Sequence, residues 1–195
     1  FLFLTDLAFV SLGYALSLKL FNSHIRSSEP TFFGWFIALF CYQPFFSVFN
    51  AGYIEYQHIS WEPYMQGPFL QKIWGCLILV VIGIYSWASV AFGLRFSNLT
   101  HRGVIRHGPY YFCKHPAYVM KITSFVLVSV PFLISDFETA FRSVVMLALL
   151  AVVYYYRAKT EEAHLSGIDE TYLAYSNEVD ERWRRWLGWW RGKKV

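Results

Sequence analysis

The chain has 195 residues, of which 56% are hydrophobic, 21% aromatic and only 15% charged. An ordinary soluble domain carries about 25% charged residues, so the composition excludes that class. The mean hydropathy of +0.34, with only 12 glycines and 7 prolines, also excludes a disordered or collagen-like chain. The 3 cysteines are odd in number and predict no disulfide framework. Because the chain begins with Phe1 rather than Met, we expect further residues upstream.

Five apolar runs long enough to cross a bilayer follow one another. A spanning helix needs about 20 mostly apolar residues, and runs near this length cover residues 1–21, 31–52, 70–94, 117–135 and 139–156. A buried helix of a soluble bundle would show a polar stripe with helical period, and a run such as CLILVVIGIYSWASVAFGL shows none. The sequence therefore predicts an all-α polytopic membrane protein with about five transmembrane helices.

Lysine and arginine gather in connections that would share one side of the membrane. They follow the first run, fill the connection after the third run and crowd the tail, whereas the opposite side carries Glu55, Glu62, Asp136 and Glu138. Basic flanks stay in the cytoplasm, so we expect a multi-pass protein of the bacterial inner membrane or endoplasmic reticulum, with its N-terminus outside and its active site on the cytoplasmic side. This asymmetry explains the net charge of +4, and we expect membrane lipids but no nucleic acid as partners.

Two polar segments flank these runs. The stretch 53–69, rich in Tyr and Trp, is typical of an interfacial segment on the outer face. The tail from Asp169 ends in RWRRWLGWWRGKK, which suits an amphipathic helix or strap on anionic lipid. Alternatively, the tail serves only to fix the orientation of the protein in the membrane.

The connection after the third run carries the residues that point to chemistry. It contains His101, His107 and His115, and Pro116 suits the first position of the next helix. Free backbone N–H groups at that helix start would favour a negatively charged or polar ligand group. Neither the spacing nor the number of His and Cys residues fits zinc, so no metal site is predicted.

A second polar patch, Thr160-Glu161-Glu162-Ala163-His164, follows the fifth run. Carboxylates at a helix C-terminus interact unfavourably with the helix dipole, so the presence of two of them suggests a functional role. The alternative is that they form a solvated pair on the protein surface. The short turn near residues 135–138 predicts an antiparallel hairpin of the last two runs. This hairpin would bring the patch to the His115 loop and form a ligand pocket at the membrane surface.

These motifs together resemble a known family. The series GPYYFCKHPAY, an apolar hairpin, TEEAHL, ETYLAY and a basic tail is similar to the isoprenylcysteine carboxyl methyltransferase (ICMT) family, relatives of the phospholipid methyltransferases. The resemblance covers about residues 93–175. Each motif alone is weak evidence for the family, but the combination of motifs at this spacing is specific. Lys114 stands where the family usually has Arg, and Ala163 where a basic residue is common. An ammonium cannot reproduce the bidentate contact of a guanidinium.

The resemblance implies S-adenosylmethionine as cofactor and a lipophilic or lipid-linked substrate that enters sideways between helices. By position, it implies that the following residues bind the cofactor: Gly108, Pro109, Tyr110, Lys114, His115, Pro116, Tyr118, Glu161 and Glu162. It further suggests Arg95 and Glu162 as catalytic candidates. Residues 1–94 would then form the first three transmembrane helices, with the outer segment at 53–69, and residues 95–195 the catalytic region.

The chemistry of methyl transfer agrees with these residue types. A sulfonium donor is already activated, so the protein must mainly align the acceptor and exclude water. A carboxylate acceptor, such as an isoprenylcysteine, needs no base, whereas an amine acceptor would need one. Aromatic faces could hold the sulfonium by cation–π attraction, with Tyr110, Tyr111 and Phe112 as candidates. The sequence contains no G-x-G-x-x-G motif after a strand-like run, so we do not expect it to bind this cofactor as a soluble Rossmann domain does.

Two other functions remain open at this point. A sterol-type membrane reductase would use NADPH, although the GPY and His-Pro-Ala-Tyr elements at family spacing favour methyl transfer. A non-catalytic membrane adaptor would work through its basic aromatic tail. The adaptor hypothesis predicts that deletion of residues 182–195 abolishes function while His115→Ala has no effect.

Overall fold

The computed structural model describes residues 1–49, 65, 67–97, 99–129 and 137–192. This part is mostly helical, with helices α1 (Leu2–Ala15), α2 (Phe32–Leu39), α3 (Phe46–Phe49), α4 (Pro68–Phe92), α5 (Pro116–Ser129), α6 (Phe137–Ile168) and α7 (Glu170–Gly192). The connections contain short 3-10 helices, η1 (Lys19–Phe21), η4 (Gly93–Arg95) and η5 (Gly108–Tyr111), and two short strands, β1 (Ser27–Ser28) and β2 (Thr100–His101).

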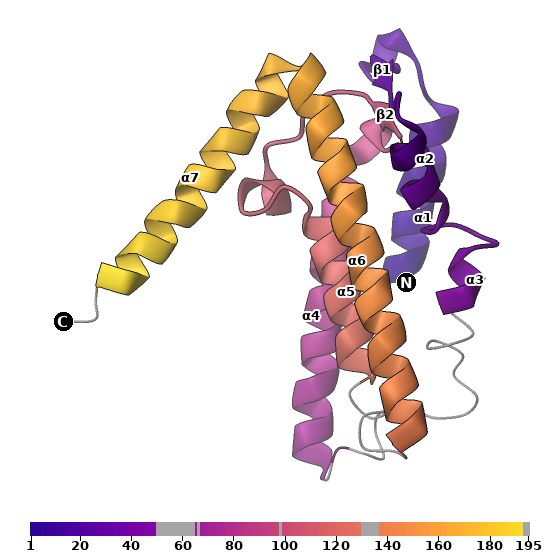
Figure 1. Cartoon of the computed structure of the whole chain (residues 1–195), viewed down its shortest axis with the longest axis vertical. Helices are drawn as coiled ribbons and strands as arrows, with labels where there is room; N and C mark the ends of the chain where they lie inside the picture. Colours follow the sequence, from indigo (N-terminus) through magenta and orange to yellow (C-terminus); the bar gives the residue numbers. More distant parts are fainter. Residues whose placement is uncertain (50–64, 66, 98, 130–136, 193–195) are drawn as a thin grey trace.

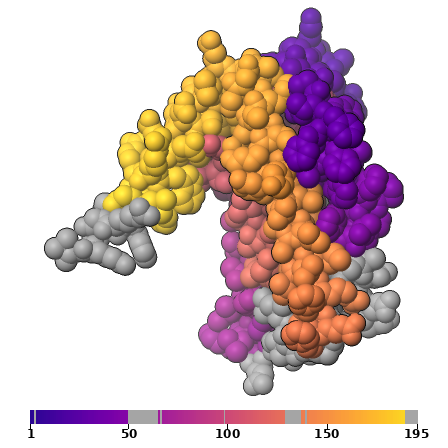
Figure 2. Space-filling view, in the orientation of Figure 1, coloured from indigo at the N-terminus to yellow at the C-terminus, as the bar shows by residue number. Residues whose placement is uncertain are grey.

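The long helices form an antiparallel bundle whose polar connections meet at one end. α5 packs against both α4 and α6, α1 packs on α4, and α2 packs on α6. The end that holds η4, β2 and η5 is called the site end here, and both strands lie there (Figure 1). α7 begins at the site end and slopes back away from it, and in the space-filling view its far half stands clear of the bundle (Figure 2).

Two helices are long and apolar enough to cross a membrane, namely Pro68–Arg95 and Ala140–Ile168. Only 28% and 22% of their most apolar stretches are buried, whereas the core helix of a soluble protein would be mostly buried. Large apolar side chains such as Leu79 and Phe141, each 61% exposed, point away from the bundle. A continuous exposed apolar surface of this kind suits contact with lipid. The chain is thus a helical protein with two candidate spans, and the five-span topology stays a prediction.

The second apolar run does not form one helix. α2 has only 8 residues, and α3 has 4. Pro44 lies between them; proline lacks an N–H and disfavours helical geometry in the residue before it. At about 1.5 Å per residue, α2 is far shorter than the ~30 Å hydrocarbon core. The prediction of a single spanning helix over this run is therefore wrong for the described residues.

α6 is longer than the fifth apolar run. It continues without a break through the TEEAHL segment to Ile168. Glu161 and Glu162 therefore lie inside the helix rather than in its last turn, and the argument from the helix dipole does not apply to them. The first half of the predicted turn at 135–138 lies outside the described residues, and its second half already belongs to α6. Most of the predicted outer segment 53–69 also lies outside the described residues. The tail forms a helix, α7, as the sequence predicted among its alternatives.

Two clusters of buried side chains hold the helices together. One cluster joins α4, η5 and α7 through Ala88, Ile105, Tyr110, Tyr172, Tyr175 and Val179. The other joins the α2–α3 region to α6 through Cys41, Phe49, Leu150 and Tyr154. The first cluster lies directly beside the polar connections, so it fixes the position of η5 relative to the start of α7.

The packing of α2 depends on Gly34. A Cβ atom at this position would lie 2.5 Å from Cγ and Cδ of Glu29. Glu29 is only 6% exposed, and its carboxylate accepts hydrogen bonds from the backbone N–H of Thr31, at 3.0 Å, and from the Thr31 hydroxyl. The glutamate cannot move aside without breaking these bonds.

We therefore expect Gly34→Ala to destabilise the protein by about 1–3 kcal/mol, because overpacking displaces a bonded, buried side chain. The measurement is the apparent melting temperature of the detergent-solubilised protein. The matched control is Gly83→Ala on α4, where a Cβ meets nothing within 4 Å and the melting temperature should not fall. Equal melting temperatures for Gly34→Ala and the parent would contradict this account of α2.

Candidate functional site

Hydrogen bonds join the start of α5 to α6. Pro116 begins α5, which places His115 just before the helix and Tyr118 in its first turn. The His115 Nε2 atom lies 3.2 Å from Glu162 Oε1, and the Tyr118 hydroxyl donates to Glu161 Oε2 at 3.0 Å. The rings of His115 and Tyr118 stack with their centroids 5.3 Å apart. The loop before α5 and the acidic pair of α6 therefore meet, although 47 positions separate His115 from Glu162.

Arg157 completes this network from the turn of α6 before the acidic pair. Its Nε donates to the Tyr118 hydroxyl at 2.9 Å, and its guanidinium lies 5.2 Å from the centre of the Tyr118 ring. On the other side the guanidinium lies 5.5 Å from the ring of Tyr42. The Tyr118 hydroxyl accepts from Arg157 and can therefore direct its own proton to Glu161. This arrangement fixes the position of the Glu161 carboxylate.

The two carboxylates of the pair face different spaces. Glu161 lines a cavity at the site end, whereas Glu162 lines a neighbouring groove between α5, α6 and α7. Glu162 also accepts a hydrogen bond from Lys159 at 2.8 Å, so its charge is already compensated. The geometry therefore gives Glu161 access to a ligand in the cavity and gives Glu162 the task of holding His115.

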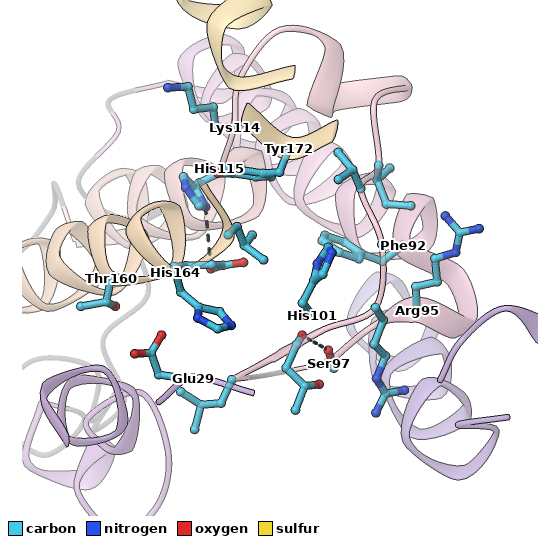
Figure 3. A pocket seen from close by; sticks show the side chains of 18 of the residues that line it. Glu29, Phe92, Arg95, Ser97, His101, Lys114, His115, Thr160, His164 and Tyr172 are labelled. Carbon is cyan, nitrogen blue, oxygen red and sulfur yellow. Dashed lines mark hydrogen bonds and ion pairs between the residues drawn. The ribbon is translucent and has the colours of Figure 1, made fainter. Parts of the chain in front are cut away.

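The cavity has an empty volume of about 880 Å³ with its open mouth included. In the close view, Glu29 and His164 lie on one side of the hollow, Phe92 and Arg95 on the other, and His101 between them (Figure 3). The wall thus combines charged groups with an aromatic surface.

A short strand ladder brings the N-terminal part of the chain to the cavity. Ser27 lies opposite His101 and Ser28 opposite Thr100 in the antiparallel pair of β1 and β2. The Ser27 hydroxyl lies 3.1 Å from Nε2 of His164 on α6. These contacts place the buried carboxylate of Glu29 in the wall, so residues from both of the regions predicted at 1–94 and 95–195 line the cavity.

A hydrogen bond between a histidine and a carboxylate connects β2 to the start of α7. Nε2 of His101 lies 2.7 Å from Oδ2 of Asp169, and His101 is only 6% exposed. Burial alone would raise the pKa of Asp169, but hydrogen bonds from His101 and Thr171 outweigh this effect and lower the pKa below its ordinary value. The carboxylate therefore stays charged at neutral pH and holds the loop against α7.

Two other titratable groups near the cavity stay neutral. Burial raises the pKa of the Tyr110 phenol, and burial also raises the pKa of the Cys113 thiol. A protonated thiol is a poor nucleophile, so the site does not present Cys113 as a covalent catalyst. No group of three or more His, Cys, Asp or Glu residues in the described ranges could hold a metal ion.

The residues implied by the resemblance fall into two groups. Those that line the cavity are Arg95, Tyr110, Lys114, His115, Tyr118 and Glu161. The remaining ones do not line it: Gly108, Pro109, Pro116 and Glu162. Gly108 has a φ of 62°, and a Cβ there would lie 3.3 Å from the Trp87 side chain, so this glycine permits the tight turn into η5. The two prolines begin η5 and α5 and shape the loop.

Three aromatic residues and one lysine of the loop have distinct environments. Tyr110 lines the cavity, but Tyr111 and Phe112 do not; both are exposed, and Arg182 lies 4.0 Å from the centre of the Tyr111 ring. Among the three candidates for holding a sulfonium, only Tyr110 is therefore in position. The Lys114 ammonium pairs with Asp180 of α7 at 2.8 Å, so it ties the loop to α7.

Sequence reasoning missed Glu29, Arg157 and Tyr172 as cavity residues. Glu29 carried a usable signal, because it is an acidic residue in a connection whose other charged residues are basic. Arg157 carried a weaker signal, a charge directly after an apolar run. Tyr172 lies in a polar, helical tail that also contains Tyr175, and nothing in the pattern singled it out.

The Asp169 contact predicts how stability depends on pH. A carboxylate whose pKa is lowered by folding adds stability above its ordinary pKa of 3.8, and this stability is lost as the pH falls through the lowered value. Asp169→Asn should therefore reduce stability at pH 7 by about 1–2 kcal/mol. The difference from the parent should begin to shrink below about pH 4, where the unfolded parent takes up a proton, and should be lost once the pH falls below the lowered pKa of the folded protein.

Thermal unfolding of the two proteins from pH 3 to pH 8 measures this dependence. The exposed neighbour Glu170 supplies the control variant, Glu170→Gln, which should follow the parent at every pH. A constant difference between Asp169→Asn and the parent over this range would rule out the charged contact as its cause.

Comparison with known proteins agrees with this geometry. Residues 74–167 match the family described as the Isoprenylcysteine carboxyl methyltransferase (ICMT) family. No curated protein and no solved structure matches the chain. The matched segment runs from α4 to the end of α6 and includes His115, Tyr118 and Glu161. Over this segment, which is just under half of the chain, the protein is similar to the ICMT family, a family of membrane methyltransferases.

Proposed function

We propose that the protein transfers a methyl group from S-adenosylmethionine to a lipophilic acceptor at the membrane surface. The observation that carries this proposal is that His115, Tyr118 and Glu161 meet at one cavity within the segment that matches the family. A solvated surface pair of glutamates would have no reason to form hydrogen bonds with a histidine and a partly buried tyrosine at the start of another helix. The cavity instead has the composition of a ligand site.

The residues of the cavity fit the cofactor chemically. When bound, the cofactor supplies a methyl group that is already activated by the positive charge on sulfur. Glu161 offers a negative charge that Tyr118 holds in place, which suits a cationic ligand. Phe92 and Tyr110 offer aromatic surface, with their ring centroids 4.9 Å apart. Together, a carboxylate beside aromatic rings matches a ligand that joins a cation to a flat heterocycle.

We expect the residues of this chain to promote methyl transfer mainly by positioning the reactants and by excluding water. Glu161 lies in a partly enclosed site, where charge–charge attraction is stronger than in bulk water. Tyr118 and Arg157 hold the carboxylate, so it need not reorganise during reaction. The helices around the cavity also limit the access of water, which would compete with the acceptor.

The groove beside the cavity suggests how the acceptor reaches the site. It shares Lys114, His115 and Tyr118 with the cavity. Its walls are mainly apolar, formed by side chains of α5, α6 and α7. Val119 at its edge is 46% exposed, on a helix face that suits contact with lipid. A lipophilic molecule could therefore slide from the bilayer toward the cavity without leaving an apolar environment.

A carboxylate acceptor, such as that of an isoprenylcysteine, suits the site best. Its oxygen would accept the methyl group directly from the sulfonium and release no proton, so the site would need no base. Glu161 and His115 both take part in hydrogen bonds that position them, which suits binding better than proton abstraction. Arg95 lines the cavity and forms no ion pair within the described part of the chain, so it is the proposed partner of the acceptor carboxylate.

Binding of the cofactor tests the role of Glu161. Glu161→Gln should weaken binding of S-adenosylmethionine by roughly tenfold or more, because it removes the negative charge near the sulfonium. Binding of S-adenosylhomocysteine, whose sulfur is neutral, should weaken less. Isothermal titration calorimetry on purified protein measures both constants, with Glu170→Gln as the matched control. Equal losses for the two ligands would exclude a contact between Glu161 and the sulfonium.

Transfer of labelled methyl groups tests the reaction itself. Membranes that contain the protein should move radiolabel from S-adenosylmethionine into the lipid-soluble fraction, and mild alkali should release it as volatile methanol, because methyl esters hydrolyse under these conditions. His115→Ala should abolish this transfer. Label that resists alkali would point to an amine acceptor. No transfer together with binding of NADPH would support a sterol-type reductase, and no transfer or cofactor binding would support an adaptor.

A further inference from the structure

The second half of α7 carries positive charge that the proposed function does not use. Between residues 182 and 195 the sequence has six basic residues and no acidic residue. Three of the basic residues belong to the part of the helix whose side chains the structure describes: Arg182, Arg184 and Arg185. None of these three lies within ion-pair distance of a carboxylate among the described residues. No described ion pair therefore neutralises this half of the helix.

The first half of α7 is tied to the protein instead. The Lys114 ammonium lies 2.8 Å from the Asp180 carboxylate, and the Arg106 guanidinium lies 3.7 Å from the Glu178 carboxylate. Both basic partners belong to the loop before α5. In the space-filling view the far half of α7 stands clear of the bundle (Figure 2). The helix thus has one half with partners in the protein and one half that faces outward.

Aromatic and apolar side chains accompany the arginines. Trp183, Trp186 and Leu187 are all about half exposed, and the rings of the two tryptophans have their centroids 5.5 Å apart. Tyr111 of the neighbouring loop is also about half exposed, and the Arg182 guanidinium lies 4.0 Å from the centre of its ring. Exposed apolar groups bordered by charge are typical of surfaces that contact a membrane or another protein. Tryptophan and tyrosine in particular prefer the boundary between lipid and water.

The direction of α7 brings this half back to the lipid-facing part of the bundle. The helix begins at the site end and slopes away from it (Figure 1). Trp183 lines the same groove as Ile122 of α5 and Tyr155 of α6, and both of these residues belong to apolar runs that we expect to cross the membrane. Of the two kinds of partner, a membrane fits better, because arginine beside tryptophan at this level is the pattern of residues that contact anionic headgroups.

α7 also holds the loop that carries His115. The Trp183 Nε1 atom donates a hydrogen bond to the Phe112 carbonyl oxygen at 2.7 Å. The Tyr175 hydroxyl donates to the Tyr110 carbonyl oxygen, also at 2.7 Å. Both acceptors lie in the few residues before His115. The position of this loop therefore depends on the position of α7.

We propose that the second half of α7 binds the headgroups of anionic phospholipids in the leaflet beside the site, and that this binding holds the His115 loop in place. A negatively charged leaflet attracts basic segments, and the tryptophans insert at the same boundary. The helix then transmits the lipid contact to the loop through the hydrogen bonds of Tyr175 and Trp183. The inference goes beyond the proposed function, because it names a lipid that is not the methyl acceptor, and it holds whichever ligand the cavity binds.

Hydrogen–deuterium exchange of the full chain in nanodiscs tests both parts of this inference. Nanodiscs of phosphatidylcholine alone are compared with nanodiscs that also contain the anionic lipid phosphatidylglycerol. In the mixed nanodiscs, amide exchange should slow by roughly threefold or more in residues 182–188 of α7 and in residues 108–115 of the loop. Exchange in residues 140–150 of α6, toward the opposite end of the bundle, should not change. High salt should weaken the effect, because it screens the charges.

Removal of charge tests which residues contact the lipid. The double variant Arg184→Gln and Arg185→Gln should lose most of the lipid effect, because both side chains are exposed and supply positive charge to the headgroups. The matched control removes two exposed positive charges at the opposite end of the bundle, by Lys72→Gln with Arg142→Gln. The control should respond to phosphatidylglycerol like the parent. In phosphatidylcholine all three proteins should have the same melting temperature, which shows that they are folded.

A second pair of variants tests the link between α7 and the loop. Tyr175→Phe with Trp183→Phe removes both side-chain donors to the loop carbonyls and keeps an aromatic ring at each position. In mixed nanodiscs, lipid should still protect residues 182–188, whereas the added protection of residues 108–115 should be lost. Trp186→Phe leaves both hydrogen bonds in place and is the control, which should keep both effects.

Each outcome supports or overturns one part of the inference. Equal exchange in the two kinds of nanodisc overturns it, as does an equal loss of the lipid effect in the control at Lys72 and Arg142. Protection of residues 182–188 by inorganic phosphate in phosphatidylcholine nanodiscs would assign the arginines to a soluble anion. A dimer that the Arg184 and Arg185 variant dissociates would assign them to a second copy of the chain, and either result overturns the lipid partner. Loop protection that persists without both hydrogen bonds overturns the link between α7 and the loop. Failure of the parent to bind S-adenosylmethionine would end the proposed function and leave these readouts unaffected.

Discussion

The site depends on the hydrogen bonds that join the start of α5 to α6. Tyr118 accepts from Arg157 and donates to Glu161, while Glu162 holds His115. Buried charges of this kind are costly unless each one is paired, so the network constrains the register of the two helices as well as the direction of the side chains. A shift of either helix along its axis would separate these partners and leave charges unpaired in a partly apolar setting.

A second constraint closes the cavity from the other side. The β1–β2 ladder holds the connection after α1 against the connection after α4, and the hydrogen bond between His101 and Asp169 holds the same loop against α7. Segments far apart in the chain therefore share one cavity at the site end of the bundle. The charged groups of the cavity come from α6, with Arg157 and Glu161, and from the connections, with Glu29, Arg95, Arg102 and Lys114; α4, η5 and α7 supply aromatic surface.

The sequence predicted the parts of this site that depend on local pattern. The sequence correctly placed the His-Pro-Ala-Tyr element next to the Glu-Glu pair, because an antiparallel hairpin must return its second helix to the start of the first. The break between α2 and α3 was not predicted, since apolar composition alone does not report helix continuity and the effect of Pro44 was overlooked. Glu29 and Tyr172 could not be placed either, because their positions depend on strand pairing and helix docking between distant segments. The different surroundings of Glu161 and Glu162 follow from the rotation of α6, which no pattern in one sequence specifies.

Photochemical cross-linking of radiolabelled S-adenosylmethionine to the purified protein, followed by peptide mapping, tests most directly whether these distant segments bind one molecule. The account predicts that label appears both in peptides from the loop before α5, within residues 99–118, and in peptides from α6 and early α7, within residues 157–175. An excess of S-adenosylhomocysteine should prevent labelling of both. Label confined to other parts of the chain, or labelling that the competitor leaves unchanged, would contradict the account.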